Sequence, residues 1–263
     1  MNHNNNNNNI SRKRPIENVL VSQGGGSLGA FACGVYKTLH KKNINFDIVG
    51  GTSIGGINGA IIAGSKNDNP VKDLEDFWLE LAESSYTIIP DIITLDYDES
   101  KGIGLKTIPS ASLNATIYGI PKMFIPRWLQ TTNISEKSLL DKQQLPWNWT
   151  YIYDNSPLGK TLQKYIDFKK LSPEMNSSSS FSDTTKTVRF IVTAVNVLNA
   201  EPLIFDSFKM QIQLKHLLAS VGYPNYGFPW VEVEDGVYGW DGALLSNTPM
   251  REVLLQSPSY DKN

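Results

Sequence analysis

One serine lies in a glycine-rich turn that could make it a nucleophile. Ser53 is the centre of Gly51-Thr52-Ser53-Ile54-Gly55, between a strand-like run at 46–49 and a helix-like run at 54–63. Small residues around the serine of a G-x-S-x-G segment allow a tight strand-to-helix turn that exposes the hydroxyl. The same residues would fit an ordinary helix N-cap at Thr52 or Ser53. The order of strand, turn and helix favours the nucleophile.

An earlier glycine-rich turn could hold the negative charge that such a nucleophile creates. Gly24-Gly25-Gly26-Ser27-Leu28-Gly29 follows the strand-like run 18–22 and opens a helix-like run. Backbone N–H groups at the start of a helix stabilise anions, because the helix dipole is positive there. The N–H groups of Gly24, Gly25 and Gly26 are therefore candidates for an oxyanion hole.

The spacing of Gly24, Gly26 and Gly29 also fits a dinucleotide-binding fingerprint with Asp47 as the ribose-binding acid. This interpretation predicts an oxidoreductase that uses NAD(P). Asp47 lies at the start of a predicted strand, whereas the ribose-binding acid normally lies at a strand's carboxyl end. The dinucleotide interpretation also leaves the Ser53 turn unexplained.

A serine nucleophile needs a general base. The three histidines fall in the Asn-rich tail, at the end of a helix and within a helix, at His3, His40 and His216. Asp241, between the strand-like run 237–240 and Gly242, lies on a turn where a carboxylate can project into a site, or can bond its own backbone. A carboxylate is a weak base for an alcohol, so this pair would need a strong oxyanion hole and a water-poor pocket.

Three motifs in this order, Gly24–Gly29, Gly51–Gly55 and Asp241-Gly242-Ala243, resemble those of the patatin-like phospholipases, and the segments 219–224, 227–229 and 246–249 support the resemblance. The resemblance implies a three-layer α/β/α fold with a mostly parallel central sheet. It implies Ser53 as nucleophile, Asp241 as proton acceptor and an oxyanion hole at Gly24, Gly25 and Gly26. The remaining motif positions are Gly29, Gly51, Gly55 and Gly242. The implied substrate is a phospholipid or another acyl lipid, with no metal or cofactor.

Composition and charge indicate a folded protein whose small net charge does not attract a nucleic acid. The net charge is −2 and the isoelectric point is near 5.9, so no basic field recommends a nucleic-acid ligand. The single Cys33 excludes an internal disulfide framework and suits a small core position. No secretory or membrane-spanning segment is predicted, and we expect a cytoplasmic protein that can contact membranes peripherally.

The chain is predicted to form one domain, 16–263, after a disordered Asn-rich tail at 1–15. Further strands are expected at 188–195 and 202–205. Helical spacing of Leu28, Ala32, Val35 and Leu39 predicts a helix that ends near 41–43, and further helices are expected after Asn69-Pro70, after Ser156-Pro157 and over 212–221.

Two segments interrupt this pattern. Residues 86–150 are rich in proline and aromatic residues without a clean period, and 176–187 form a polar Ser/Thr-rich loop. The first segment could be a cap or lid whose tryptophans meet lipid, or its rings could pack on the core. A catalytically silent, membrane-associated module therefore stays open as a further alternative.

Overall fold

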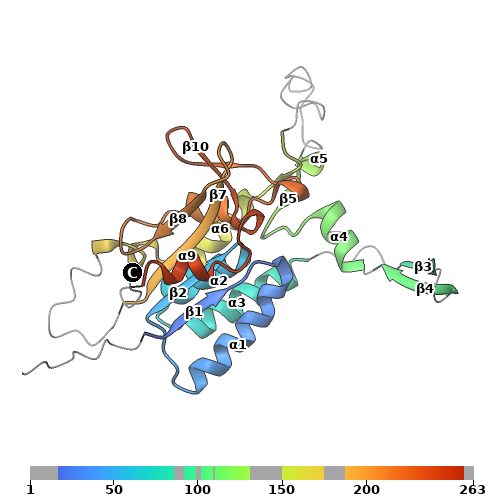
Figure 1. Ribbon diagram of the computed structural model, residues 1–263. Helices are drawn as coiled ribbons and strands as arrows, with labels where there is room; N and C mark the ends of the chain where they lie inside the picture. Colours follow the sequence, from blue (N-terminus) through green and yellow to red (C-terminus); the bar gives the residue numbers. More distant parts are fainter. Residues whose placement is uncertain are drawn as a thin grey trace, which may run out of the picture.

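The computed structural model describes residues 17–85, 92–98, 102–108, 110–130, 150–174 and 187–257. The predicted tail at 1–15 and nearly all of the loop at 176–187 lie outside the described residues. Figure 1 shows the elements, whose bounds in chain order are β1 Val19–Ser22, η1 Gly26–Leu28, α1 Gly29–Lys41, β2 Ile48–Thr52, α2 Ile54–Ala63, α3 Pro70–Glu83, β3 Ile92–Asp98, β4 Gly102–Ile108, α4 Ser110–Tyr118, β5 Ile125–Pro126, α5 Arg127–Gln130, β6 Tyr153–Asp154, α6 Ser156–Tyr165, η5 Phe168–Lys170, β7 Arg189–Asn196, β8 Pro202–Asp206, α8 Leu214–Ser220, η6 Pro224–Tyr226, β9 Val231–Glu234, β10 Val237–Asp241, η7 Gly242–Leu244 and α9 Met250–Leu254.

The main sheet of the described residues has six strands, and most of them point the same way. β1 pairs with β2, and β2 with β7, in parallel. β10 runs antiparallel to β7, and β9 antiparallel to β10, so β9 points in the same direction as β7. β8 is antiparallel to β7. The predicted mostly parallel sheet is therefore present, with β8 and β10 as its two reversed strands.

One edge of β7 carries two other strands in succession. Its residues 189–193 pair with β2, and its residues 194–196 pair with β10. β8 pairs with residues 191–195 and so occupies the opposite edge. Because β2 runs parallel to β7 and β10 runs antiparallel, the carboxyl ends of β2 and β10 point at each other along this shared edge.

Both faces of the sheet are covered, which gives three layers. Alternate residues of a strand point to opposite faces, and in β7 Phe190 and Val192 belong to the larger core while Ile191 belongs to a smaller one. Helices α2, α3, α6 and α8 bury their apolar residues in the larger core. Val253 of α9 packs with Ile48 and Ile191 on the other face.

Local sequence explains why the helices begin where they do. α2 is buried on nearly all sides, consistent with its run of Ile, Ala and Gly. Asn69 caps α3 as predicted, because its side chain accepts the Lys72 N–H at 3.1 Å and proline occupies the first turn. At α6 the N-cap is Asn155, one residue before the predicted Ser156-Pro157 start.

Helix α1 forms over the predicted residues, but its apolar stripe faces outward. The buried residues of α1 are Gly29, Cys33 and Tyr36. Leu28 and Val35, which belong to the stripe that predicted the helix, are exposed. Cys33 lies in the core as expected, and its burial raises the pKa of the thiol.

The insert at 86–150 contains more regular structure than its sequence indicates. β3 and β4 form an antiparallel pair, and α4, β5 and α5 follow (Figure 1). The Phe124 ring packs edge-on against Tyr153 and Phe228, at centroid distances of 5.2 Å. At this point the aromatic rings pack against the body of the protein, whereas Trp147 and Trp149 lie outside the described residues. No helix among the described residues is long and apolar enough to cross a bilayer.

Candidate active site

The Ser53 turn is a strained strand-to-helix bend. Ser53 follows β2 directly and has φ 55° and ψ −130°, in the left-handed half of the backbone map that side chains other than glycine rarely adopt. A Cβ on Gly51 would lie 2.4 Å from the carbonyl carbon of Gly55, and one on Gly55 would lie 2.4 Å from the carbonyl oxygen of Ser22. Both glycines are therefore required by backbone contact.

The Ser220 side chain binds the backbone at this bend. The Ser53 N–H donates to the Ser220 hydroxyl oxygen at 2.9 Å, and that hydroxyl donates to the Thr193 carbonyl at 2.7 Å. Ser220 is fully buried at the end of α8. The strained residue is thus tied through one side chain to the middle of the sheet, which limits how Ser53 can move.

Asp241 reaches Ser53 because of the sheet register. Thr52, the last residue of β2, lies opposite Thr193, and Asp241, the last residue of β10, lies opposite Ala194. The ends of the two strands therefore meet, and the Ser53 hydroxyl lies close enough to the Asp241 carboxylate to lower its pKa.

The environment of Asp241 changes its acidity. The residue is 3% exposed, and its carboxylate accepts the Ala243 N–H at 2.8 Å. Burial raises the pKa of Asp241 to about 6, although the hydrogen bonds from Ser53 and from Ala243 lower it. The carboxylate is consequently ionised at neutral pH but a stronger base than an ordinary aspartate.

The first glycine turn lies beside Ser53. A Cβ on Gly24 would lie 3.0 Å from the Ser53 Cβ. The Gly24 N–H donates to the Asn247 carbonyl at 3.0 Å, whereas Gly25 and Gly26 are exposed, with φ of 149° and 56°. Of the three glycines in this turn, Gly24 is therefore the one whose N–H is bound to the protein itself.

A second polar link joins the nucleophile turn to the loop after Asp241. The hydroxyls of Thr52 and Thr193 are 2.6 Å apart, and the Thr52 hydroxyl donates to the Ser246 carbonyl at 3.1 Å. A Cβ on Gly242 would lie 2.8 Å from the Thr193 carbonyl oxygen, so this loop needs glycine to approach β7. These contacts fix the two loops relative to each other.

The other candidate residues from the sequence lie elsewhere. His216 is buried, stacks on Phe205 at 4.4 Å and accepts the Gln213 N–H at its Nδ1, and burial lowers its pKa to about 4. His40 is near the end of α1. Asp47 precedes β2 and accepts the Asn18 N–H at 2.7 Å. It therefore lies at the amino ends of β1 and β2, whereas the glycine turn follows the carboxyl end of β1. That position does not suit a ribose-binding acid.

Sequence reasoning assigned no role to Ser220, Thr193 or Asn247. Ser220 and Asn247 belong to segments that supported the family resemblance, but their spacing from Ser53 along the chain gives no sign of contact. Gly29 has a packing role, because a Cβ there would lie 2.6 Å from the Ile54 and Trp78 side chains.

Comparisons with known proteins identify the family of the chain. The family model for Patatin-like phospholipase matches residues 20–254. The lysophospholipase nte1 of Aspergillus terreus is 29% identical over 156 residues, which are 56% of this chain and 10% of that protein. The human patatin-like phospholipase domain-containing protein 6 is 27% identical over 126 residues, 46% of this chain and 9% of that protein. The chain thus spans about a tenth of the length of these relatives.

Among solved structures, VipD from Legionella pneumophila is similar with a TM-score of 0.45 and 15% identity, over 94% of this chain and 48% of that one. The match of the family model covers most of the sequence, from β1 to α9. The chain therefore belongs to the patatin-like phospholipases.

Proposed function

We propose that this protein hydrolyses acyl esters of lipids, with Ser53 as nucleophile and Asp241 as proton acceptor. The observation that carries the proposal is the strand register, which brings the end of β2, directly before Ser53, to the end of β10 at Asp241 on one edge of β7. Membership of the phospholipase family supports a lipid ester as substrate.

Asp241 would take the Ser53 proton as the hydroxyl oxygen attacks the ester carbonyl. A general base works best when its pKa is near the working pH. Burial raises the pKa of Asp241 to about 6, so the carboxylate is ionised at pH 7 and more basic than in water. A hydrogen bond from the Ser53 hydroxyl to this carboxylate would orient the proton toward the base.

The oxyanion would be held by the N–H groups of Gly25 and Gly26. The Gly24 N–H already donates to Asn247, so Gly24 contributes by its small size next to Ser53 rather than by its N–H. Positive φ at Gly25 and Gly26 turns the backbone in a way that glycine tolerates and other residues do not. Donors fixed before the reaction stabilise the tetrahedral intermediate without reorganisation.

The reaction would proceed in two halves. In the first, the oxyanion collapses, the alcohol leaves with the proton from Asp241, and the acyl group stays on Ser53. In the second, Asp241 takes a proton from water, the water oxygen attacks the acyl carbonyl, and the fatty acid leaves as Ser53 regains its proton.

Covalent labelling tests the nucleophile. A fluorophosphonate probe is expected to label the wild-type protein at Ser53, as located by peptide mass spectrometry, and not the Ser53→Ala variant. Asp241→Asn is expected to lower hydrolysis of a soluble short-chain p-nitrophenyl ester by about a hundredfold or more, because the base is lost. Ser27→Ala, which removes an exposed hydroxyl of the first turn, serves as the matched control. Full hydrolysis by the Asp241→Asn variant would refute the assignment.

A further inference from the structure

We propose that the outward face of α1, together with the loop after Asp241, is the surface on which this protein contacts a lipid bilayer. The inference rests on the proposed function, because it names the physical form in which the ester substrate is met. It assigns the contact to a surface other than the aromatic insert.

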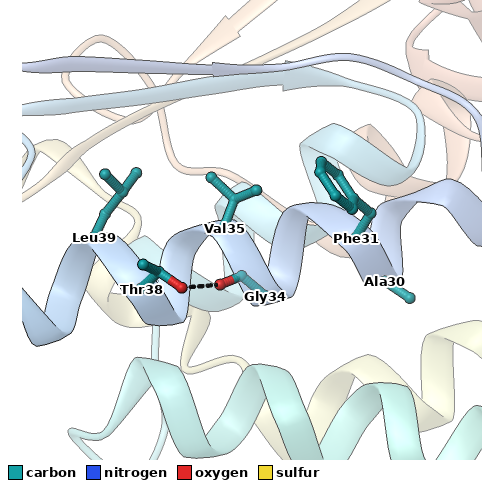
Figure 2. A pocket seen from close by; sticks show the side chains of 6 residues that line it. All are labelled: Ala30, Phe31, Gly34, Val35, Thr38 and Leu39. Atoms are coloured by element: carbon teal, nitrogen blue, oxygen red, sulfur yellow. Dashed lines mark hydrogen bonds between the residues drawn. The ribbon is translucent and has the colours of Figure 1, made fainter.

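The outward face of α1 is an exposed apolar stripe. Phe31 is 79% exposed, Leu28 65% and Val35 39%, and Leu39 continues the row at helical spacing. Figure 2 shows Phe31, Val35 and Leu39 along one side of the helix. These side chains line a shallow groove of about 410 Å³. Isolated exposed apolar residues are ordinary, but a continuous row of them marks a contact surface.

The stripe begins at the proposed active site. The Leu28 N–H donates to the Gly25 carbonyl at 3.2 Å, so the first apolar side chain lies directly after the proposed oxyanion turn. Gly29 packs on Ile54, the residue after Ser53. A surface at this end of α1 would therefore bring the nucleophile close to whatever the stripe contacts.

The segment after Asp241 also carries exposed apolar side chains. Leu244 is 41% exposed, Leu245 51% and Met250 54%. The Gly24 N–H bond to the Asn247 carbonyl holds this loop against the first glycine turn. Exposed apolar residues thus occur next to the proposed oxyanion turn and in the segment after Asp241.

The distribution of charge favours hydrocarbon over a protein partner. The sequence contains no Asp, Glu, Lys or Arg at 18–36 or at 242–250. Lys37 projects to the other side of α1, where it pairs with Glu75. A surface without charges enters a bilayer without desolvating ions, whereas protein interfaces normally have a polar rim. Exposed Lys41 and Lys42 at the far end of α1 can reach the phosphates of the headgroups.

Vesicle binding tests the proposal. The Ser53→Ala protein, which leaves the lipid intact, is mixed with phosphatidylcholine vesicles and the bound fraction is measured by co-sedimentation. Adding Phe31→Ser and Val35→Ser is expected to lower the partition coefficient by about tenfold or more, because two apolar side chains no longer enter the bilayer. Phe208→Ser is the matched control and is expected to bind as before. It also replaces an exposed phenylalanine by serine, but next to Arg189 at the start of β7, away from the proposed site. High salt is expected to leave the binding to these neutral vesicles unchanged.

Several results would overturn the proposal. They are absence of binding by the parent protein, equal binding by the Phe31→Ser/Val35→Ser protein, and binding that requires anionic lipid and is released by salt. A dimer of the parent protein that becomes a monomer in the double variant, seen by light scattering, would assign the stripe to a second copy instead.

A separate measurement distinguishes this proposal from the proposed function. The protein with Ser53 intact is assayed on the soluble ester. Failure to hydrolyse it, with vesicle binding retained, would refute the catalytic assignment and leave the lipid surface standing. Hydrolysis of the soluble ester without stripe-dependent binding would refute the lipid surface and leave the catalytic assignment standing.

Discussion

Replacing Asp241 by asparagine is expected to stabilise the folded protein while it removes activity. In the folded state burial raises the pKa of Asp241 from 3.8 to about 6. Above pH 6 the carboxylate is ionised in both the folded and the unfolded state. The free energy of unfolding is then lowered by an amount proportional to the difference between the two pKa values. At about 1.4 kcal/mol for each pKa unit, this cost is about 3 kcal/mol at pH 8. Asparagine has no charge to bury and can still accept the Ala243 N–H.

The sign of the effect follows from the raised pKa. The full stability is present below the pKa that Asp241 has in the unfolded state, where its carboxyl is neutral in both states. This stability is lost as the pH rises through the pKa that Asp241 has in the folded state. The gain from Asp241→Asn is therefore expected to fall from about 3 kcal/mol at pH 8 to about 0.5 kcal/mol at pH 4. Equilibrium urea unfolding of both proteins at several pH values measures this difference.

The matched control is Asp235→Asn, which removes the same charge from the exposed β9–β10 turn and is expected to change little at any pH. Equal stability of wild type and Asp241→Asn at pH 8 would refute the reasoning. So would a gain that does not depend on pH, because it would come from packing or hydrogen bonding and not from the buried charge.

Further predictions concern the pH profile and the residues around the site. The kcat/KM on a soluble ester is expected to fall about tenfold per pH unit below about pH 6, as Asp241 takes up a proton; a profile that stays flat down to pH 4.5 would contradict its role as base. Ser220→Ala leaves the buried Ser53 N–H and Thr193 carbonyl without this partner, so unfolding measurements are expected to show a loss of about 1–3 kcal/mol, and kinetics a lower kcat at similar KM; an unchanged kcat would show that Ser220 does not position the nucleophile. Gly51→Ala is expected to yield no soluble folded protein on expression, because its Cβ would meet backbone at 2.4 Å. Burial lowers the pKa of His216 from 6.5 to about 4. The free energy of unfolding of the wild type is therefore expected to fall by about 3 kcal/mol because of this residue as the pH decreases from 6.5 to 4. His216→Gln is expected not to show this decrease in the same urea series.

The sequence predicts the elements of the site better than their assembly. The glycines around Ser53 indicate a sharp turn because no larger residue fits there, and that requirement is local. The meeting of Ser53 with Asp241 depends on the pairing of β2 and β10 with the same edge of β7, a contact between residues far apart in the chain. Residue spacing alone does not determine strand register over such a distance, so its position on a turn makes Asp241 a candidate, and its role as partner of Ser53 comes from the family resemblance.

Helix α1 shows the same limit in another form. Its periodicity predicts the helix correctly, but the helix has an apolar stripe on the outside as well as a buried face with Cys33 and Tyr36. Hydrophobic pattern cannot decide which of two uncharged faces turns inward. The buried one is the face that Gly29 brings close to Ile54 and Trp78. The role of Ser220 was hidden for a similar reason, since a buried hydroxyl has no local signature.

The head-on meeting of β2 and β10 has a consequence for biosynthesis. Asp241 is synthesised nearly two hundred residues after Ser53, and a contact between such distant segments forms slowly. The growing chain would therefore hold the serine with no carboxylate beside it until β10 pairs with β7. Under the proposed function, hydrolysis of lipid esters would begin only after that pairing.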